Sequence, residues 1–400
     1  MAFLLLPVLA LAGLLGAIDA SFDTCDFNCE LPRCYCNNYK IPGGLSAPET
    51  PQMVLFTFSD RVSGNLRKTL IDIFPDSLRN PQNDCPVSLT IFVLGSGSDY
   101  CAVHKLYVRG HEIATYGINR TGNTEEWTEF DWEKQFIDHA EEMVEKAFLP
   151  DDHVRGARTP LQKPGGDNQY NTLYGKGFMY DSTLLGGAKS LEEEQLPPWP
   201  VTLDIPWGNR FQCLTPRCPT KSYDGFWELP ILRLINPENG RMCAFLDDCV
   251  VSLRTPNDVY RLLYLNFRHH YDTNRAPMMI NLATKTLKNK VAVAGLKMFL
   301  QTIVSDGHDD TFLVTFQDVI AWMESPQPIS KVGDLWICPP RKFHRCDTED
   351  DIAARTRGVK PVSPFRSILF VDQLWIFQMV FLMVSYFIVR RYDRLKYKKT

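Results

Sequence analysis

The sequence lacks an excess of basic residues, and it shows no internal repeat. Its formal net charge is −4, and 36 bases against 44 acids between residues 21 and 365 give that part a charge of −8. Nucleic acid is therefore excluded as an expected partner, because its phosphates are bound by clustered cations. Cationic peptides and partly deacetylated glycans remain compatible with this charge. Hydrophobic residues make up 44% of the chain and charged residues 22%, which predicts a folded core rather than bulk disorder.

Zinc-ribbon spacing is also absent from the cysteines, although there are twelve of them. Cys34 and Cys36 are separated by one residue, whereas zinc ribbons use pairs separated by two or more. An even number of cysteines in an exported chain favours disulfides formed in an oxidising compartment. We expect Cys213–Cys218 and Cys338–Cys346 to form local bridges.

The first twenty residues are almost wholly apolar and end in small residues, although no basic residue precedes the apolar run. This pattern predicts a signal peptide over residues 1–20, with a buried N-terminal helix as the alternative. A cysteine-rich N-terminal extension over residues 21–45 follows it directly. We therefore expect the protein to enter the secretory pathway.

A second apolar run covers residues 368–389 and would reach about 33 Å as a helix, which is enough to cross a bilayer. The tail over residues 390–400 carries six bases and one acid, which is typical of a cytoplasmic segment. A polar stalk over residues 347–367 precedes the run. We expect a single-pass membrane protein with an extracellular N-terminal domain, and a C-terminal helix packed on that domain is the alternative.

Strand and helix patterns alternate between these two ends. Continuous apolar and β-branched runs predict strands, and apolar residues at helical spacing predict helices. The expected strands are 53–58, 87–94, 113–118, 278–282 and 311–315, and the expected helices are 66–74, 100–108, 128–147, 256–271, 291–304 and 317–323. This alternation predicts an α/β barrel or an open parallel sheet.

Eight sequence motifs carry a family resemblance. In chain order they are CELPRCYC with IPGGL, PQMVLFTFSD, KLYVRGHEIATYGINR, RTPLQKPGGDNQYNTLYGKGFMYDST, WPVTLDIPW, CPTKSYDGFWELP, LNFRHHYDTNRAP and FLVTFQDVIAWMESP. Together they resemble the polysaccharide deacetylase family in its animal, chitin-deacetylase-like form, over residues 29–346. The resemblance implies a distorted (β/α) barrel of the polysaccharide deacetylase type over residues 46–346. It also implies descent from enzymes that remove N-acetyl groups from chitin-like polymers with a metal ion.

The same resemblance implies that the catalytic and metal positions are degenerate. In the family the first strand ends in an aspartate that acts as general base and an aspartate that binds metal; here Ser59 and Asp60 hold these places. A serine hydroxyl cannot take a proton from metal-bound water near neutral pH. Tyr116 and Arg120 stand where the family has two metal-binding histidines, and a guanidinium does not bind zinc. Ala283 stands where the family has a histidine as general acid.

Other positions match the family. Arg158 and Asp167 are retained around the former site. Trp199 and Trp227 could form a glycan-binding wall, although aromatics in such barrels are more often part of the core. Asp60 and Arg120 are expected to form an ion pair in place of the metal.

The segment Asn119–Arg120–Thr121 is a sequon for N-glycosylation on the same loop. A glycan on Asn119 would stand at the mouth of the former cleft. The sequon can equally be unused.

We favour a membrane-tethered, extracellular, chitin-deacetylase-like pseudoenzyme that binds chitin-like polysaccharide or extracellular matrix partners without hydrolysis. No cofactor is expected. One alternative is an active, zinc-dependent chitin deacetylase with a site rebuilt from Asp60, His111, Glu112 and Asp167, although His111 is favoured as an ordinary loop histidine. Another alternative is a protein-binding receptor or a matrix-organising component.

Overall fold

The computed structural model describes residues 29–347, except 37–38, 121–122, 187–195, 210, 237–238, 306–307 and 339. The expected signal peptide, the membrane span, the cytoplasmic tail and nearly all of the stalk lie outside the described residues. Within the described part, no helix is both long enough and apolar enough to cross a membrane.

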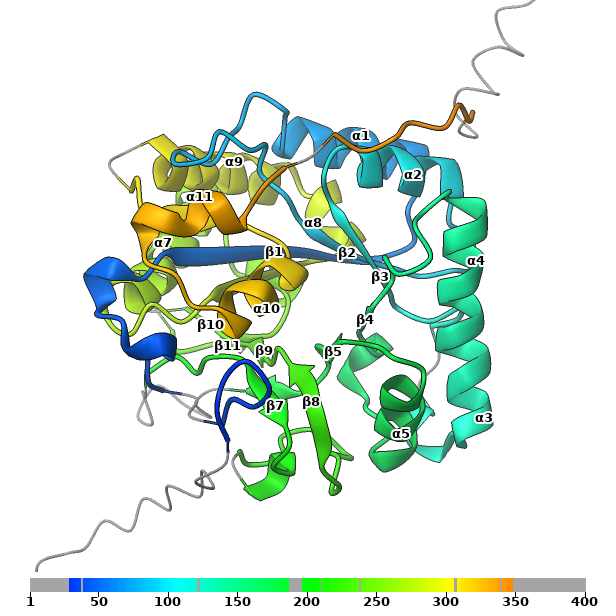
Figure 1. Cartoon of the computed structure of the whole chain (residues 1–400). Coiled ribbons are helices and arrows are strands. Elements are labelled where there is room, and N and C mark those ends of the chain that lie inside the picture. The colour runs from blue at the N-terminus through cyan, green and yellow to red at the C-terminus, as the bar shows by residue number, and fades with distance from the viewer. Residues whose placement is uncertain are drawn as a thin grey trace, which may run out of the picture. The chain divides into compact units, whose positions relative to one another are not determined.

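A curled, mostly parallel sheet carries the fold (Figure 1). Its strands follow the order β12-β1-β2-β3-β4-β5-β8-β7, with β13 also paired to β1, and only the β7–β8 pair is antiparallel. The strands are β1 Gln52–Asp60, β2 Thr90–Val93, β3 Glu112–Thr115, β4 Gly156–Ala157, β5 Tyr180–Asp181, β7 Val201–Leu203, β8 Tyr223–Glu228, β12 Met278–Leu282 and β13 Thr311–Leu313. Two small sheets pair β6 (Leu185–Gly186) with β9 (Ile231–Leu232) and β10 (Leu234–Ile235) with β11 (Met242–Cys243). Among the described residues no strand pair closes this path into a ring, so the expected barrel is an open, curled sheet.

Helices α2, α4 and α5 follow β2, β3 and β4 in the chain and lie on the outer side of the sheet in Figure 1. The helices are α1 Gly64–Ile73, α2 Tyr100–Val108, α3 Glu129–Trp132, α4 Asp138–Lys146, α5 Asp167–Gly175, α6 Leu246–Val250, α7 Pro256–Asp272, α8 Thr284–Lys288, α9 Lys290–Ser305, α10 Phe316–Glu324 and α11 Val332–Leu335. The long helix expected from residue 128 is interrupted by a π-helical turn over Glu133–Ile137. Four of these helices begin at an N-cap residue whose side-chain oxygen accepts a hydrogen bond from a backbone N–H of the first turn. These residues are Ser63 for α1, Asp99 for α2, Thr255 for α7 and Thr315 for α10.

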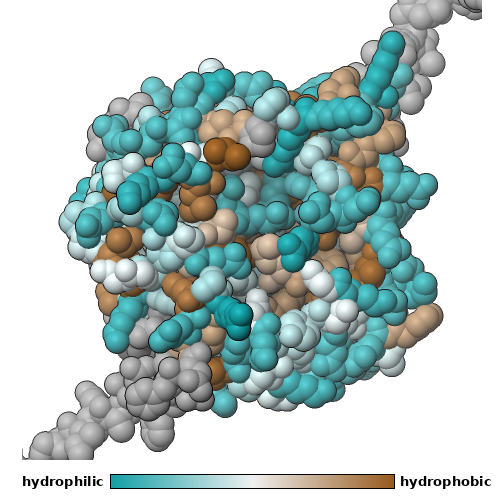
Figure 2. All heavy atoms as spheres, in the orientation of Figure 1, coloured by the Kyte–Doolittle hydropathy of each residue, from teal (hydrophilic) through white to brown (hydrophobic). Residues whose placement is uncertain are grey.

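Strand β1 lies in the middle of the core. Its residues from Gln52 to Ser59 are all buried, as expected for a parallel strand covered on both faces. Phe56 packs edge-on against Phe74 at a centroid distance of 5.1 Å. On the face drawn in Figure 2, apolar side chains are scattered among polar ones. Most of the large apolar side chains are buried in the core.

Five disulfides join described cysteines, and none of the described cysteines is free. Cys213–Cys218 forms as predicted. The predicted Cys338–Cys346 bridge is wrong, because Cys338 pairs with Cys85 and Cys346 pairs with Cys101, across sequence separations of 253 and 245 residues. The other bridges are Cys29–Cys34 and Cys243–Cys249.

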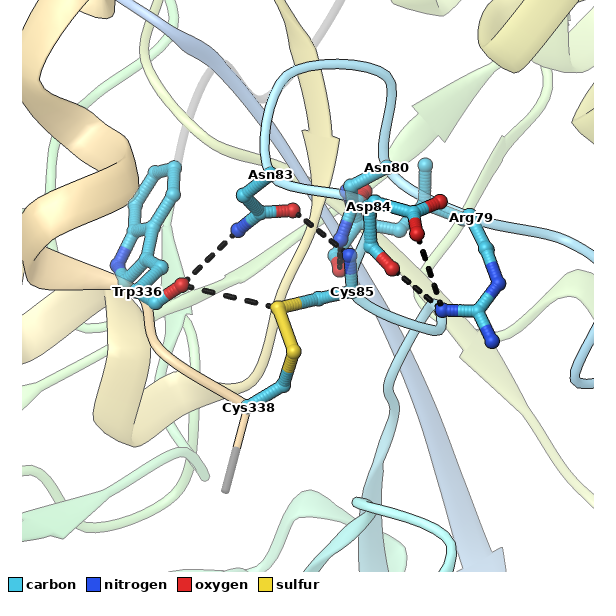
Figure 3. The surroundings of a disulfide bond; sticks show 8 residues. Arg79, Asn80, Asn83, Asp84, Cys85, Trp336 and Cys338 are labelled. Atoms are coloured by element: carbon cyan, nitrogen blue, oxygen red, sulfur yellow. Dashed lines mark hydrogen bonds and ion pairs between the residues drawn. A yellow bond between two sulfur atoms is a disulfide. The ribbon is translucent and has the colours of Figure 1, made fainter. Parts of the chain in front are cut away.

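The misassigned cysteines lie at two places on one segment, residues 336–346, which we call the C-terminal strap. The strap runs along α2 in Figure 1, where it is drawn in orange. Figure 3 shows its first bridge, Cys85–Cys338, beside a hydrogen bond of 3.0 Å from the Asn83 side-chain amide to the Trp336 carbonyl oxygen. Tertiary packing therefore brings each strap cysteine closer to a distant cysteine than to its neighbour in sequence.

Candidate functional site

The carboxyl ends of neighbouring strands bring five of the predicted site residues together. In the registered sheet Asp60 lies opposite Val93, Val93 opposite Thr115, and Thr115 opposite Ala157. Strand β12 adds Leu282, which pairs with Phe58 of β1. Side chains that end these strands or directly follow them therefore share one edge of the sheet: Ser59, Asp60, Tyr116, Arg158 and Ala283.

Arg158 directly follows β4 and is fully buried. Its guanidinium donates to the Thr57 hydroxyl at 2.8 Å, the Ser59 hydroxyl at 3.1 Å and the Ser182 hydroxyl at 2.8 Å. It also donates to the Ser182 carbonyl oxygen at 2.8 Å and approaches the Met279 sulfur at 3.4 Å. All five N–H groups are thus directed at neutral acceptors, and among the described residues no carboxylate bonds to this cation.

The surroundings of Arg158 stabilise its positive charge without a direct ion pair. The guanidinium lies 4.2 Å from the centroid of the Phe92 ring, where a cation–π interaction is favourable. Burial lowers the pKa of Arg158 to about 10, while the acidic groups Asp181 and Glu228 act in the opposite direction. Arg158 therefore remains a cation near neutral pH.

Ser59 occupies the position at which the family resemblance places a general base. Its hydroxyl oxygen accepts a hydrogen bond from a cation, which makes that oxygen less basic than a free hydroxyl. A general base must instead be able to take a proton near the working pH. The geometry at Ser59 is that of a structural acceptor for Arg158.

Tyr116 is buried directly after β3, and the backbone N–H of Leu161 donates to its hydroxyl at 3.4 Å. Burial raises the pKa of Tyr116, and Asp60 adds to this effect, while Leu161, Arg158 and Arg120 oppose it. The phenol is therefore neutral near pH 7. A neutral phenol is a poor replacement for an imidazole ligand of zinc.

Asp60 and Arg120 do not form the expected ion pair. Within the described residues no salt bridge joins them, and Asp60 accepts a hydrogen bond of 2.8 Å from the backbone N–H of Arg61. Arg120 is exposed on the loop after β3. The ion pair was expected from their positions in the sequence, but the loop holds Arg120 on the surface.

The residues at this edge do not fit a zinc ion. Of the three ligand positions, Asp60 alone offers a carboxylate, Tyr116 offers a buried neutral phenol and Arg120 is a cation. A search of the described residues finds no group of three or more histidine, cysteine, aspartate or glutamate side chains that could hold a metal ion. We therefore derive no reaction step through a metal here.

Comparisons with known proteins identify the relatives of this chain. It is 31% identical over 325 residues to Chitin deacetylase 1 of Bombyx mori, a match that covers 78% of this chain and 58% of the relative. It is 28% identical over 333 residues to Chitin deacetylase 8 of Bombyx mori, covering 82% of this chain and 85% of the relative. This chain belongs to the chitin-deacetylase-like family of polysaccharide deacetylases. No family model matches the chain.

Solved structures of polysaccharide deacetylases also align with this family member. A putative polysaccharide deacetylase from Mycobacterium smegmatis aligns with a TM-score of 0.46 and 16% identity, covering 78% of this chain and 99% of that chain. A probable polysaccharide deacetylase from Pseudomonas aeruginosa aligns with a TM-score of 0.44 and 13% identity, covering 69% of this chain and 92% of that chain.

Two further positions that the family resemblance singled out, Ala283 and Asp167, lie at the beginnings of helices. Ala283 is the N-cap residue of α8, and it offers no side-chain hydrogen bond to that helix. Asp167 begins α5 and accepts hydrogen bonds of 2.8 and 3.1 Å from the backbone amides of Thr220 and Lys221. Burial tends to raise the pKa of Asp167, but the bonds from Thr220 and Lys221 outweigh it and hold the pKa below its ordinary value. In this chitin-deacetylase-like protein Asp167 therefore fixes a loop.

The predicted glycan-binding wall is wrong for this structure. Trp199 has no exposed surface and stacks on Trp322 at a centroid distance of 5.5 Å. Trp227 lies in β8 and is 1% exposed. Neither ring has a free face on which a sugar could stack, because both are packed into the core.

The rebuilt site is not assembled either. Glu112 pairs with Thr90, three residues before the Val93–Thr115 pair, so it lies about 10 Å below the edge that carries Asp60. Tyr180 donates to one Glu112 oxygen at 2.6 Å, and the Thr90 hydroxyl donates to the other at 3.0 Å.

His111 lies at this lower end too, where its Nδ1 accepts the Leu89 backbone N–H at 3.3 Å. Burial lowers the pKa of His111 to about 3, so the ring is neutral. The structure thus separates His111 and Glu112 from Asp60, and Asp167 is engaged with its own loop.

Sequence reasoning missed a buried pair of acids. Asp181 of β5 lies opposite Glu228 of β8, and both are fully buried. The Tyr170 hydroxyl lies 3.0 Å from an oxygen of each. Asp181 also accepts from the Gln169 amide and the Thr183 hydroxyl, both at 2.9 Å. Both acids end strands in the quoted MYDS and FWELP motifs, and this was the signal available in the sequence.

Burial raises the pKa of Asp181 to about 6, and burial together with the charge of Asp181 raises the pKa of Glu228 further. One proton therefore stays on the pair near neutral pH, and the pair carries a single negative charge. That charge offsets the buried cation of Arg158, whose pKa both acids raise.

Asn119 is exposed, and its backbone N–H donates to the Gln135 side chain at 3.1 Å. Thr121 lies outside the described residues. Glycosylation of Asn119 stays a prediction.

Proposed function

We propose that this protein is a membrane-tethered, extracellular, chitin-deacetylase-like pseudoenzyme that binds chitin-like polysaccharide without hydrolysing it. The observation that carries the proposal is the 3.1 Å hydrogen bond from the Arg158 guanidinium to Ser59, at the place where the resemblance puts the catalytic base. Family membership supports the substrate class.

The chemistry of deacetylation supports the loss of activity. Hydrolysis of an N-acetyl group needs a base that activates water and an acid that protonates the departing amine. Ser59 and Ala283 stand at the two positions and supply neither group. Tyr116 and Arg120 add no metal ligand that could make a water acidic.

Export and tethering are further parts of the proposal. Five described disulfides are typical of a protein that folds in an oxidising, secretory environment. The tether rests on the apolar run over residues 368–389, and entry into the secretory pathway rests on residues 1–20. No nucleic-acid partner and no cofactor are proposed.

The test compares binding with hydrolysis in one preparation of the full-length protein. We expect the protein to be retained on insoluble chitin, and to release no acetate from chito-oligosaccharides in buffer supplied with zinc. Acetate release that disappears in Asp60→Asn would show an active deacetylase and overturn the proposal. Loss of chitin retention, with capture of a matrix protein instead, would favour the receptor or matrix-organising alternative.

A further inference from the structure

The C-terminal strap is attached to α2 and to the loop before β2 by contacts of different kinds. Disulfides fix its two ends, through Cys338 and Cys346. Between them Arg341 donates to the Tyr107 carbonyl oxygen at 2.9 Å, and its guanidinium lies 4.5 Å from the centroid of the Tyr107 ring. Near the second bridge, the backbone N–H of His344 donates to Nε2 of His104 at 2.8 Å.

The two contacts of the His104 ring permit one protonation state. Nδ1 of His104 lies 2.8 Å from the carbonyl oxygen of Ala147, which can only accept, so Nδ1 must carry a proton. Nε2 receives the backbone N–H of His344, which can only donate, so Nε2 must keep its lone pair. A second proton on the ring would place one N–H group against another and remove the bond to the strap.

The groups that face His104 disfavour an extra charge on it. His104 has no exposed surface, and its ring packs against the rings of Phe148 and Phe343 at centroid distances of 5.7 and 5.6 Å. Burial lowers the pKa of His104, the Ala147 carbonyl oxygen opposes this, and His344 on the strap with Lys105 on α2 lowers the pKa further.

We propose that His104 is an acid-sensitive latch: protonation of its ring breaks the hydrogen bond from the His344 backbone and loosens the C-terminal strap between Arg341 and Cys346. Neutral conditions keep the strap closed, and acidic conditions open it. The strap stays tethered at Cys338 and Cys346 in both states, so the change is local and reversible.

Movement of the strap would change the shape of a hollow that is present at this end of the sheet. The hollow has a volume of about 480 Å³, and its walls include Arg341 of the strap together with Arg109, His153 and Glu112. The strap forms one wall, so its movement changes access to these polar groups. Acidic compartments of the secretory and endocytic routes would favour the open form.

Hydrogen–deuterium exchange of the full-length protein tests the latch. When the strap is released, His104 of α2 should titrate near its ordinary pKa of about 6.5. The opening equilibrium should therefore rise about 30-fold between pH 7.5 and pH 5. We expect protection of the His344 backbone amide, corrected for the intrinsic effect of pH on exchange, to fall by that factor. Amides of β12 should show no such change, which separates local release from global unfolding. Equal strap protection at the two pH values would overturn the proposal.

Two variants assign the effect to the correct ring. His104→Gln keeps an acceptor for the His344 amide but cannot take up the proton, so its strap protection should not depend on pH. His344→Ala keeps the backbone N–H, so the acid-dependent loss should persist. If His344→Ala abolishes the loss, the acid effect depends on the His344 side chain and the latch at His104 is wrong. This second variant keeps the test decisive where His104→Gln fails to fold.

Discussion

Arg158 is a buried guanidinium whose direct partners are hydroxyl, carbonyl and sulfur acceptors. Ser59 stands where the family resemblance places a carboxylate, and it offers this cation a neutral hydroxyl. The nearby pair of Asp181 and Glu228, with one shared proton, supplies the balancing charge through space. These contacts make Arg158 a structural part of the core.

Removing the Ser59 acceptor should therefore destabilise the protein. Ser59→Ala leaves one N–H of a buried cation without a partner, which costs about 1–3 kcal/mol. Urea unfolding followed by circular dichroism measures this change. Ser96→Ala, at an exposed serine of the same edge, serves as the control and should change stability little. A neutral effect of Ser59→Ala would mean that water or another acceptor satisfies Arg158.

The buried acid pair should give the stability a definite pH dependence. Glu228 has a folded pKa above its unfolded value, so the folded protein holds a proton that the unfolded chain releases. Its contribution is present below about pH 4.5 and is lost as the pH rises toward the folded pKa. We expect the stability of wild type relative to Glu228→Gln to fall from pH 5 to pH 8, as measured by urea unfolding at each pH. Exposed Glu324→Gln should show no such trend, and a trend of opposite sign would contradict the shared proton.

Secondary-structure elements were predicted well where the local pattern alone determines them. Strand β12 and helix α2 occupy the expected residues, because a mainly apolar run and an Asp99 cap define them locally. The pairing of Asp181 with Glu228 was missed because it depends on which strands become neighbours in the sheet. The Trp199 and Trp227 prediction failed for a related reason, since residue type does not reveal which face of an element the core covers.

The two long-range bridges should stabilise the fold cooperatively. With Cys101–Cys346 intact, Cys85–Cys338 closes a ring of only about 24 residues, which in the chain-entropy model is worth about 3 kcal/mol. With both bridges removed, the loop of 253 residues opens, and the loss should exceed the sum of the single losses by about 2 kcal/mol.

Serine replacement of each pair, singly and together, tests this cooperativity by denaturant unfolding. The local Cys213–Cys218 bridge closes a short loop. The loss of unfolding free energy on its removal should simply add to the loss from removing either long-range bridge. Strict additivity of the two long-range bridges would show that the strap does not act as one element.

At the scale of the whole molecule, the protein has a curled, mostly parallel sheet, and the edge at which the family resemblance places the chemistry carries Ser59, Asp60 and Tyr116. Asp60, Tyr116 and Arg120 offer one carboxylate, one neutral phenol and one cation. The four positions Ser59, Tyr116, Arg120 and Ala283 would have to change together to restore the family's set, because catalytic groups act as a unit. The residues at these positions can be named from the sequence, whereas the hydrogen bonds of Arg158 required the structure.

The most direct test is the zinc content of the full-length protein after equilibration with zinc and removal of loosely bound metal. The variant that combines Ser59→Asp, Tyr116→His, Arg120→His and Ala283→His serves as the positive control and should bind zinc. We predict far less than one zinc ion per chain in wild type by elemental analysis, because one carboxylate cannot replace a three-ligand site. About one tightly held zinc ion per wild-type chain, lost in Asp60→Asn, would contradict the assignment as a pseudoenzyme.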